Sequence, residues 1–157
     1  MPGFKVGVCW QGSPTFKGDQ HRSIALEHFA RLAQVPGVCL VSLQKRAGEE
    51  QIEPNRERVP LQVFADLDAD ATFVDTAAIM YHLDLVITSD TAIAHLAGAL
   101  GRPVWVVIPF ECDFRWLADR DDSPWYSTMR LFREPVRGDT ATPIARMVLA
   151  LREFKAC

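Results

Sequence analysis

The chain has 157 residues, 48% of them hydrophobic and 24% charged, and a formal net charge of −3. This length and apolar content fit one domain with a substantial core. The weakly acidic balance argues against the broad basic face of a nucleic-acid binder, so any phosphate recognition should be local. No apolar run approaches the roughly 18 residues needed to cross a bilayer, and a signal-peptide profile is absent. We therefore expect a cytoplasmic protein with no transmembrane segment.

Several kinds of site have no support in the sequence. The four cysteines are scattered: Cys9, Cys39, Cys112 and Cys157. They lack CxxC spacing and are expected to be reduced thiols. The histidines have no zinc spacing, and the acidic runs at residues 66–70 and 119–122 lack a calcium-loop pattern, so we expect solvated acidic turns and no metal. Without a GxGxxG or Gly-x-Ser-x-Gly motif, a nicotinamide or flavin cofactor and a serine nucleophile are not expected.

The amino-terminal part predicts a strand, a loop, a helix and a second strand. The first strand is expected over residues 4–10, followed by a polar loop over residues 11–22. Ser23 is a good N-cap for a helix to about residue 34, where Pro-Gly follows. The second strand is expected over residues 38–43.

The next segment is less regular. Residues 49–58 are charged and predict a solvated loop or a short helix. A modest third strand is expected over residues 61–64. After the acidic turn, Asp75 or Thr76 would cap a helix through Leu83.

The chain is organised around residues 84–109. Residues 85–88 are a β-branched apolar run, typical of a parallel strand covered on both faces. Asp90 is placed as the N-cap of an apolar helix that Gly101 closes, and a fifth strand over residues 104–108 follows.

The carboxy-terminal part begins with a long loop over residues 110–126, whose aromatic and charged residues either contact a ligand or cover a sheet edge. A short strand is expected over residues 129–132. Thr142 and Pro143 form an N-cap and N1 pair for a closing helix.

This alternation of strands and helices predicts an α/β fold, a Rossmann-like, doubly wound and mostly parallel sheet of about six strands. In the common order 3-2-1-4-5-6 the first and fourth strands are neighbours, and ligands bind where they diverge. The loops after these two strands should therefore meet at one crevice.

Both of these loops suit an anion. In the first, Gly12 and Ser13 allow close backbone approach, while Lys17 and Arg22 could neutralise a diphosphate. The alternative is an ordinary polar loop.

In the second, a helix N-terminus near Asp90 and Thr91 presents unpaired N–H groups and the positive end of a dipole. His95 lies one turn further on and could face the same place. The alternatives are a well-capped helix and a core histidine.

Four segments resemble a known family: residues 75–77, 84–105, 114–116 and 124–126. Above all, the run Ser-Asp-Thr-Ala-x-x-His-Leu-Ala-Gly-Ala that starts at Ser89 resembles the carboxy-terminal half of bacterial ADP-heptose:lipopolysaccharide heptosyltransferases. The nearer likeness is to the branch in which this module follows tetratricopeptide repeats. The resemblance implies one half of a GT-B fold, with no metal and no cofactor. The carboxy-terminal domain of a GT-B enzyme of this family would hold a nucleotide-sugar donor as substrate.

Taken with the loop chemistry, the resemblance predicts these donor-binding positions: Gly12, Ser13, Lys17, Arg22, Gln44, Asp90, Thr91, Ala92 and His95. The diphosphate would meet Thr91 and the amides after it. Gln44, after the second strand, would lie near the ribose, where the family favours a carboxylate. Ala92 replaces the glycine that usually starts the helix.

The implied function is sugar transfer with a nucleoside diphosphate leaving group. We expect residues 1–157 to be a single domain from a larger protein. The catalytic base would come from the missing amino-terminal domain, so this chain alone would bind donor weakly and transfer nothing. Two alternatives stay open, a non-catalytic nucleotide-sensing domain and a sugar-nucleotide epimerase of the same architecture.

Overall fold

A computed structural model describes residues 2–70 and 72–155 of the chain. Within these residues, six strands form one parallel sheet in the order β3-β2-β1-β4-β5-β6. The strands are β1 (Phe4–Cys9), β2 (Val38–Ser42), β3 (Leu61–Gln62), β4 (Leu85–Ser89), β5 (Val104–Ile108) and β6 (Met129–Arg133). The expected α/β fold and strand order are confirmed, and β1 and β4 are neighbours.

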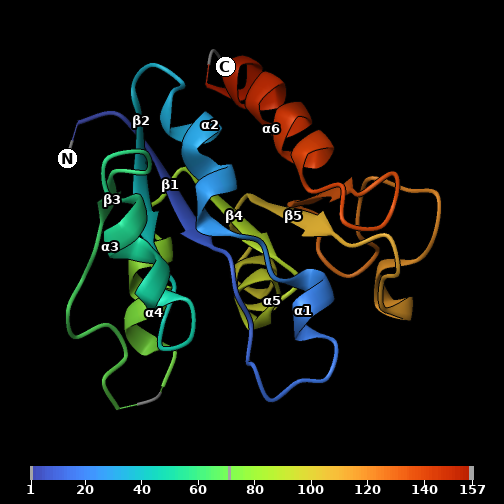
Figure 1. Cartoon of the computed structure of the whole chain (residues 1–157), viewed down its shortest axis with the longest axis horizontal. Helices are drawn as coiled ribbons and strands as arrows, with labels where there is room; N and C mark the ends of the chain where they lie inside the picture. Colours follow the sequence, from blue (N-terminus) through green and yellow to red (C-terminus); the bar gives the residue numbers. More distant parts are fainter. Residues whose placement is uncertain (1, 71, 156–157) are drawn as a thin grey trace.

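Helices cover both faces of this sheet (Figure 1). The longest are α6 (Ala141–Phe154), α5 (Ala92–Ala99) and α4 (Val74–Met80), and the shorter ones are α1 (Asp19–Arg22), η1 (Leu26–Phe29), α2 (Ala30–Ala33), η2 (Glu49–Gln51), α3 (Ile52–Asn55) and η3 (Phe114–Trp116). Helices α2 and α6 pack together on one face, and α4 and α5 pack on the other. No helix in the described part of the chain is long and apolar enough to cross a membrane.

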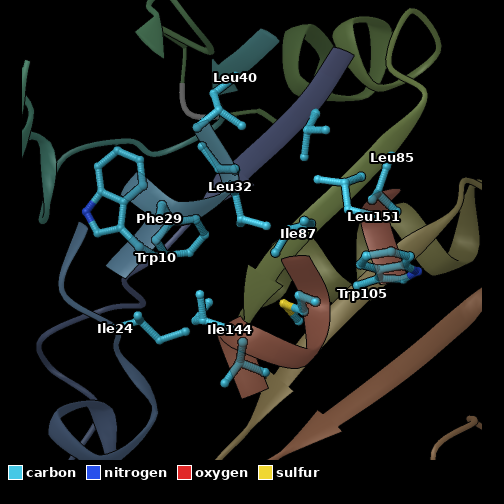
Figure 2. Close-up of a cluster of buried hydrophobic side chains, with 14 of the residues drawn as sticks. Trp10, Ile24, Phe29, Leu32, Leu40, Leu85, Ile87, Trp105, Ile144 and Leu151 are labelled. Atoms are coloured by element: carbon cyan, nitrogen blue, oxygen red, sulfur yellow. The ribbon is translucent and has the colours of Figure 1, made fainter. Parts of the chain in front are cut away.

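The face under α2 and α6 holds the larger of the two hydrophobic clusters. Side chains from the sheet and from both helices converge there, including Leu32, Ile87 and Leu151 (Figure 2). Val6 and Val8 of β1 point to this side because alternate residues of a strand face the same way. Burial of this continuous apolar surface is the main force holding the two helices on the sheet.

The opposite cluster seats α5. Ile93, Ala94 and Ala97 of this helix pack against Val86 and Val106 of the two central strands. Because β4 and β5 are buried on both faces, both read as apolar runs in the sequence, with polar residues only at the end of β4. The small side chains of α5 let the helix lie close to the sheet, which fixes where its first turn points.

The helix expected after Ser23 differs from the prediction. It begins with a 3₁₀ turn at Leu26, not after Ser23, and its N-cap is Ala25. Ser23 is withdrawn from the helix because its hydroxyl donates to Asp19 Oδ2 at 3.0 Å and accepts from Gly12 N at 3.3 Å. Ser23, the residue best suited to cap the helix, therefore forms its hydrogen bonds within the loop before it.

Helix α4 is capped from a distance. The carboxylate of Asp68 accepts from Asp75 N at 2.8 Å and Thr76 N at 3.2 Å, and Thr76 Oγ1 donates to the same carboxylate. In return, Asp68 N donates to the Asp75 carboxylate at 3.0 Å. Asp68 is therefore 2% exposed, and the expectation of a fully solvated acidic turn is wrong at this residue.

The closing helix begins slightly earlier than predicted, at Ala141 with Thr140 as its N-cap. Asp139 supports this start by accepting from Thr142 N and Thr142 Oγ1. Elsewhere, Cys9 and Cys112 are free thiols, whereas Cys157 lies outside the described residues.

Two leucines of α6 test the packing of this helix. Leu151 is fully buried and Leu149 is 61% exposed. Truncating Leu151 to alanine should lower the free energy of unfolding by about 2–5 kcal/mol, because it opens a cavity between α6 and the sheet. Leu149→Ala, the matched control, should change it by less than about 0.5 kcal/mol. Urea unfolding measures both, and equal effects would contradict the packing described here.

Candidate functional site

A pocket of about 380 Å³ opens at the carboxyl ends of β1, β2 and β4. This is the crevice predicted from the strand order. Its wall comes from the loops after β1 and β2, the segment before α4 and the start of α5, and includes Gln11, Gly12, Ser13, Arg22, Gln44, Lys45, Arg46, Asp68, Thr72, Phe73, Thr76, Thr91, Ala92 and Ile93. A volume of this size is typical of small-molecule sites.

The start of α5 forms one wall of the pocket. Thr91, not Asp90, is the N-cap, with extended backbone at φ −134° and ψ 174°. The amides of Ala92 and Ile93 belong to the first helical turn, where no carbonyl of the helix can accept from them. Both residues line the pocket, so the first turn of α5, with the positive end of its dipole, lies at the pocket wall.

Arg22 joins the two loops of the crevice. Its Nη1 donates to the carbonyl of Asp90 at 2.8 Å, and its Nε pairs with Asp19 Oδ1 at 3.1 Å. Gly12 leaves space for this pair, since a Cβ there would lie 2.5 Å from both Arg22 Nη2 and Asp19 Oδ1 and would displace them. Gly12, which was expected to allow close approach of a ligand, thus leaves space for the Arg22 guanidinium.

The other polar residues of the first loop lie in different places relative to the pocket. Ser13 lines the pocket, with its Oγ 2.8 Å from Thr15 Oγ1. Lys17 is exposed and is not part of the pocket wall. Arg22 does line the pocket, but Asp19, which is 6% exposed, balances its charge. Of the two cations expected near a diphosphate, the structure places only Arg22 there.

Gln44 is the centre of a hydrogen-bond network. Its Oε1 accepts from Trp10 N and Gln11 N, both at 2.9 Å, and its Nε2 donates to Gln11 O at 2.9 Å and Ala47 O at 2.6 Å. The side-chain amide therefore joins the loops after β1 and β2. Gln44 lies in the pocket wall as expected, but its polar atoms are already bonded to the backbone and not directed at a ribose.

His95 faces away from the pocket. Its ring stacks on Trp116 at a centroid distance of 5.2 Å, and its Nδ1 lies 3.1 Å from the hydroxyl of Tyr126. Burial lowers the pKa of His95, and so does the positive charge of Arg115, while Asp90 opposes them. His95 thus links α5 to the long loop after β5, and the structure does not bring it to the pocket beside Thr91.

That loop mainly covers the sheet. Trp116 is fully buried against it, and Arg133 holds the loop by donating to Trp116 O and Arg120 O. Trp125 is exposed and donates to Arg115 O at 3.0 Å. None of these residues lines the pocket, which favours the sheet-covering alternative over ligand contact.

Sequence reasoning missed two parts of the wall. Lys45 and Arg46 directly follow Gln44, and their place at the same sheet edge could have been read from the strand order. Thr72 and Phe73 had no such signal, because their position depends on the capping of α4 by Asp68. That bond joins residues whose pairing nothing in the local sequence indicates.

Known proteins with related sequences or folds point to one family. The profile of "Glycosyltransferase family 9 (heptosyltransferase)" matches residues 26–107. Protein FlbA of Caulobacter vibrioides is 30% identical over 158 residues, covering 99% of this chain and 26% of FlbA. The chain thus spans about a quarter of the length of this curated relative.

Two solved structures share the fold. ADP-heptose lps heptosyltransferase II of E. coli superposes with a TM-score of 0.67 at 14% identity, covering 98% of this chain and 47% of that one. E. coli heptosyltransferase WaaC with ADP gives 0.56 at 15% identity, covering 98% and 45%. This chain therefore corresponds in fold to somewhat less than half of each enzyme.

Replacing Gln44 by glutamate tests the network. A carboxylate can still accept from Trp10 N and Gln11 N but cannot donate to Gln11 O and Ala47 O. Gln44→Glu should cost about 1–3 kcal/mol of unfolding free energy at pH 7. The exposed Gln62→Glu, its control, should change stability by less than about 0.5 kcal/mol.

The loss should also depend on pH. Burial beside two carbonyls raises the pKa of a carboxyl at position 44 above its unfolded value of about 4.3. The protonated form regains one donor, so the defect should be smallest below that value and grow as the pH rises. Denaturant unfolding at pH 4 and pH 7 measures this, and a defect independent of pH would contradict the role of Gln44.

The surroundings of His95 predict its titration. The imidazole should titrate below the value of about 6.5 for a free ring, so its contribution to stability is present above that pH and is lost as the pH falls. Removing the cation in Arg115→Gln should raise the pKa of His95, and removing the anion in Asp90→Asn should lower it further. Imidazole NMR titration measures all three proteins. A midpoint at or above 6.5 in the unmodified chain would overturn the burial described here.

Proposed function

The chain belongs to glycosyltransferase family 9, the heptosyltransferase family, and we propose that it is the donor-binding half of such an enzyme. In this proposal the pocket holds the nucleoside diphosphate of a nucleotide-sugar. The observation that carries the proposal is the first turn of α5. Ala92 and Ile93 of this turn, whose amides have no acceptor within the helix, line a pocket that Gly12 and Ser13 line from the opposite loop.

The chemistry of sugar transfer gives these amides a role. When the bond to the sugar breaks, negative charge grows on the departing phosphate oxygen. Preorganised N–H groups and a helix dipole stabilise that charge more in the transition state than in the ground state. Arg22 contributes by fixing the turn through the Asp90 carbonyl. Neither a metal nor a cofactor is part of this proposal.

The remaining parts of the reaction would come from outside this chain. We propose that an amino-terminal GT-B domain supplies the acceptor base and closes the cleft, as the resemblance implies. The heptosyltransferases of similar fold are about twice as long as the part that this chain matches, which supports the proposal. Tetratricopeptide repeats in the same protein and a cytoplasmic location stay predictions.

A non-catalytic nucleotide-sensing domain is the second candidate. The observation that favours it is Gln44, whose amide is bonded to the backbone where a donor-binding carboxylate would be expected. An epimerase finds less support, since Asp68 is the one carboxylate among the described lining residues and it is engaged in capping α4. Donor hydrolysis by the longer protein would separate transfer from sensing.

Ala92→Pro tests the site with little disturbance of the helix. Proline is tolerated at the first helical position, and the extended backbone of Thr91 suits a following proline. The change deletes one N–H, so the Kd for the preferred diphosphate among UDP, GDP, ADP and dTDP should rise about 10–100-fold. Ala92→Gly keeps the amide and should bind like the unmodified chain.

Calorimetry gives the affinities, and thermal unfolding checks that both variants fold. Unchanged binding by folded Ala92→Pro would show that the first turn of α5 is not the phosphate site. If none of the four diphosphates binds the unmodified chain at millimolar concentration, the proposed function is wrong.

A further inference from the structure

Lys45 is the residue of the pocket wall whose chemistry the fold leaves unexplained. It follows Gln44 at the carboxyl end of β2 and lines the pocket. Its Nζ is shielded from solvent and has no hydrogen-bond partner among the described residues. An ammonium offers three donors, and a buried ammonium with none of them satisfied is costly. Such an arrangement is retained more readily where a ligand completes it.

The nearby carboxylates do not complete it. Asp68 accepts from Asp75 N, Thr76 N and Thr76 Oγ1. Asp70, which is exposed, accepts from Thr72 N and Thr72 Oγ1 at 3.1 and 2.7 Å.

These bonds from Thr72 are the main cause of the lowered pKa of Asp70, and the positive charge of Lys45 is the smallest of its causes. In the part of the chain that the structure describes, Lys45 forms no ion pair.

Within the described residues, neither cation on the β2 side of the pocket, Lys45 or Arg46, forms an ion pair. Arg22, a half-buried cation of the pocket, is paired with Asp19. Arg46 is exposed and adds a second positive charge beside Lys45. Its backbone is in the left-handed region, with φ +64°. The potential on the β2 side of the pocket is thus positive, and an anionic group is the ligand chemistry that it favours.

The strand order places Lys45 across the pocket from α5. Neighbouring strands lie about 4.8 Å apart, so the ends of β2 and β4 are separated by about 10 Å with β1 between them. A phosphate held at the amides of Ala92 and Ile93 would lie in that gap. The long lysine side chain can approach it from the other side as a mobile point charge.

We propose that the ammonium of Lys45 binds a phosphate oxygen of the nucleotide, from the wall opposite the first turn of α5. The inference rests on the proposed function, because it adds a binding residue to the same donor pocket. Lys45 and the α5 amides would then share the negative charge of the phosphates, a task for which the sequence had suggested Lys17.

The alternative is a packing role, with the aliphatic stem of Lys45 covering the pocket wall. Lys45→Met separates the two because it keeps an unbranched apolar stem and removes only the charge. If Lys45 is an unpaired cation awaiting a phosphate, the ligand-free variant should gain stability, with its melting temperature raised by about 2–4 °C. A packing role predicts an unchanged or lower melting temperature.

Binding is measured by calorimetry for the preferred nucleoside diphosphate, its monophosphate, its nucleoside and inorganic pyrophosphate. Lys45→Met should weaken binding of the diphosphate by about tenfold or more and leave that of the nucleoside unchanged. Lys45→Arg should restore part of the affinity. Lys155→Met is the control, since that ammonium donates to Pro36 O before β2, at the other end of the sheet.

The outcomes distinguish the inference from the proposed function. Diphosphate binding by Lys45→Met at the original affinity, or an equal loss for diphosphate and nucleoside, would overturn the inference and leave the proposed function standing. Pyrophosphate binding that depends on Lys45, without binding of any nucleotide, would show a phosphate site at Lys45 but would overturn the proposed function and, with it, the inference that this phosphate belongs to a nucleotide. A chain that binds neither pyrophosphate nor nucleotide would contradict both.

Discussion

The hydrogen bond from Arg22 to the carbonyl of Asp90 is the contact on which the site depends. It joins the loop after β1 to the turn before α5, two segments that are 68 residues apart in sequence. The bond needs Asp19 to orient and balance the guanidinium, and it needs a glycine at position 12 to leave space. Without it, the first turn of α5 would still be unpaired but would not be held against the opposite loop.

Gln44 also joins two loops, those after β1 and β2, on the other side of the crevice. A side-chain amide both donates and accepts, so it can bond to N–H and C=O groups of the backbone at once. The carboxylate favoured by the resembling family can only accept when ionised. On one side of the pocket, the Arg22–Asp19 ion pair joins two loops, and on the other side the neutral amide of Gln44 does so. The position expected to recognise a ribose has become part of the pocket wall.

The two networks leave a defined set of groups for a ligand: the amides at the start of α5, the hydroxyl of Ser13 and the cations of Lys45 and Arg46. His95 is outside this set because it packs on Trp116. It connects α5 with the loop that covers the far side of the sheet. His95 therefore acts on helix α5 itself, through stacking on Trp116 and contact with the Tyr126 hydroxyl.

The sheet, its strand order and the meeting of the β1 and β4 loops were predictable from the sequence, because apolar periodicity and parallel-strand topology are carried by local patterns. It also predicted Gly12, Ser13, Arg22, Thr91 and Ala92 at the crevice. The use of each polar group became clear only from the folded chain: Asp68 caps α4, Gln44 bonds to the backbone, His95 turns away, and Lys45 Nζ has no hydrogen-bond partner among the described residues. Hydrogen-bond partners distant in sequence decide these roles, and no local pattern records such pairings.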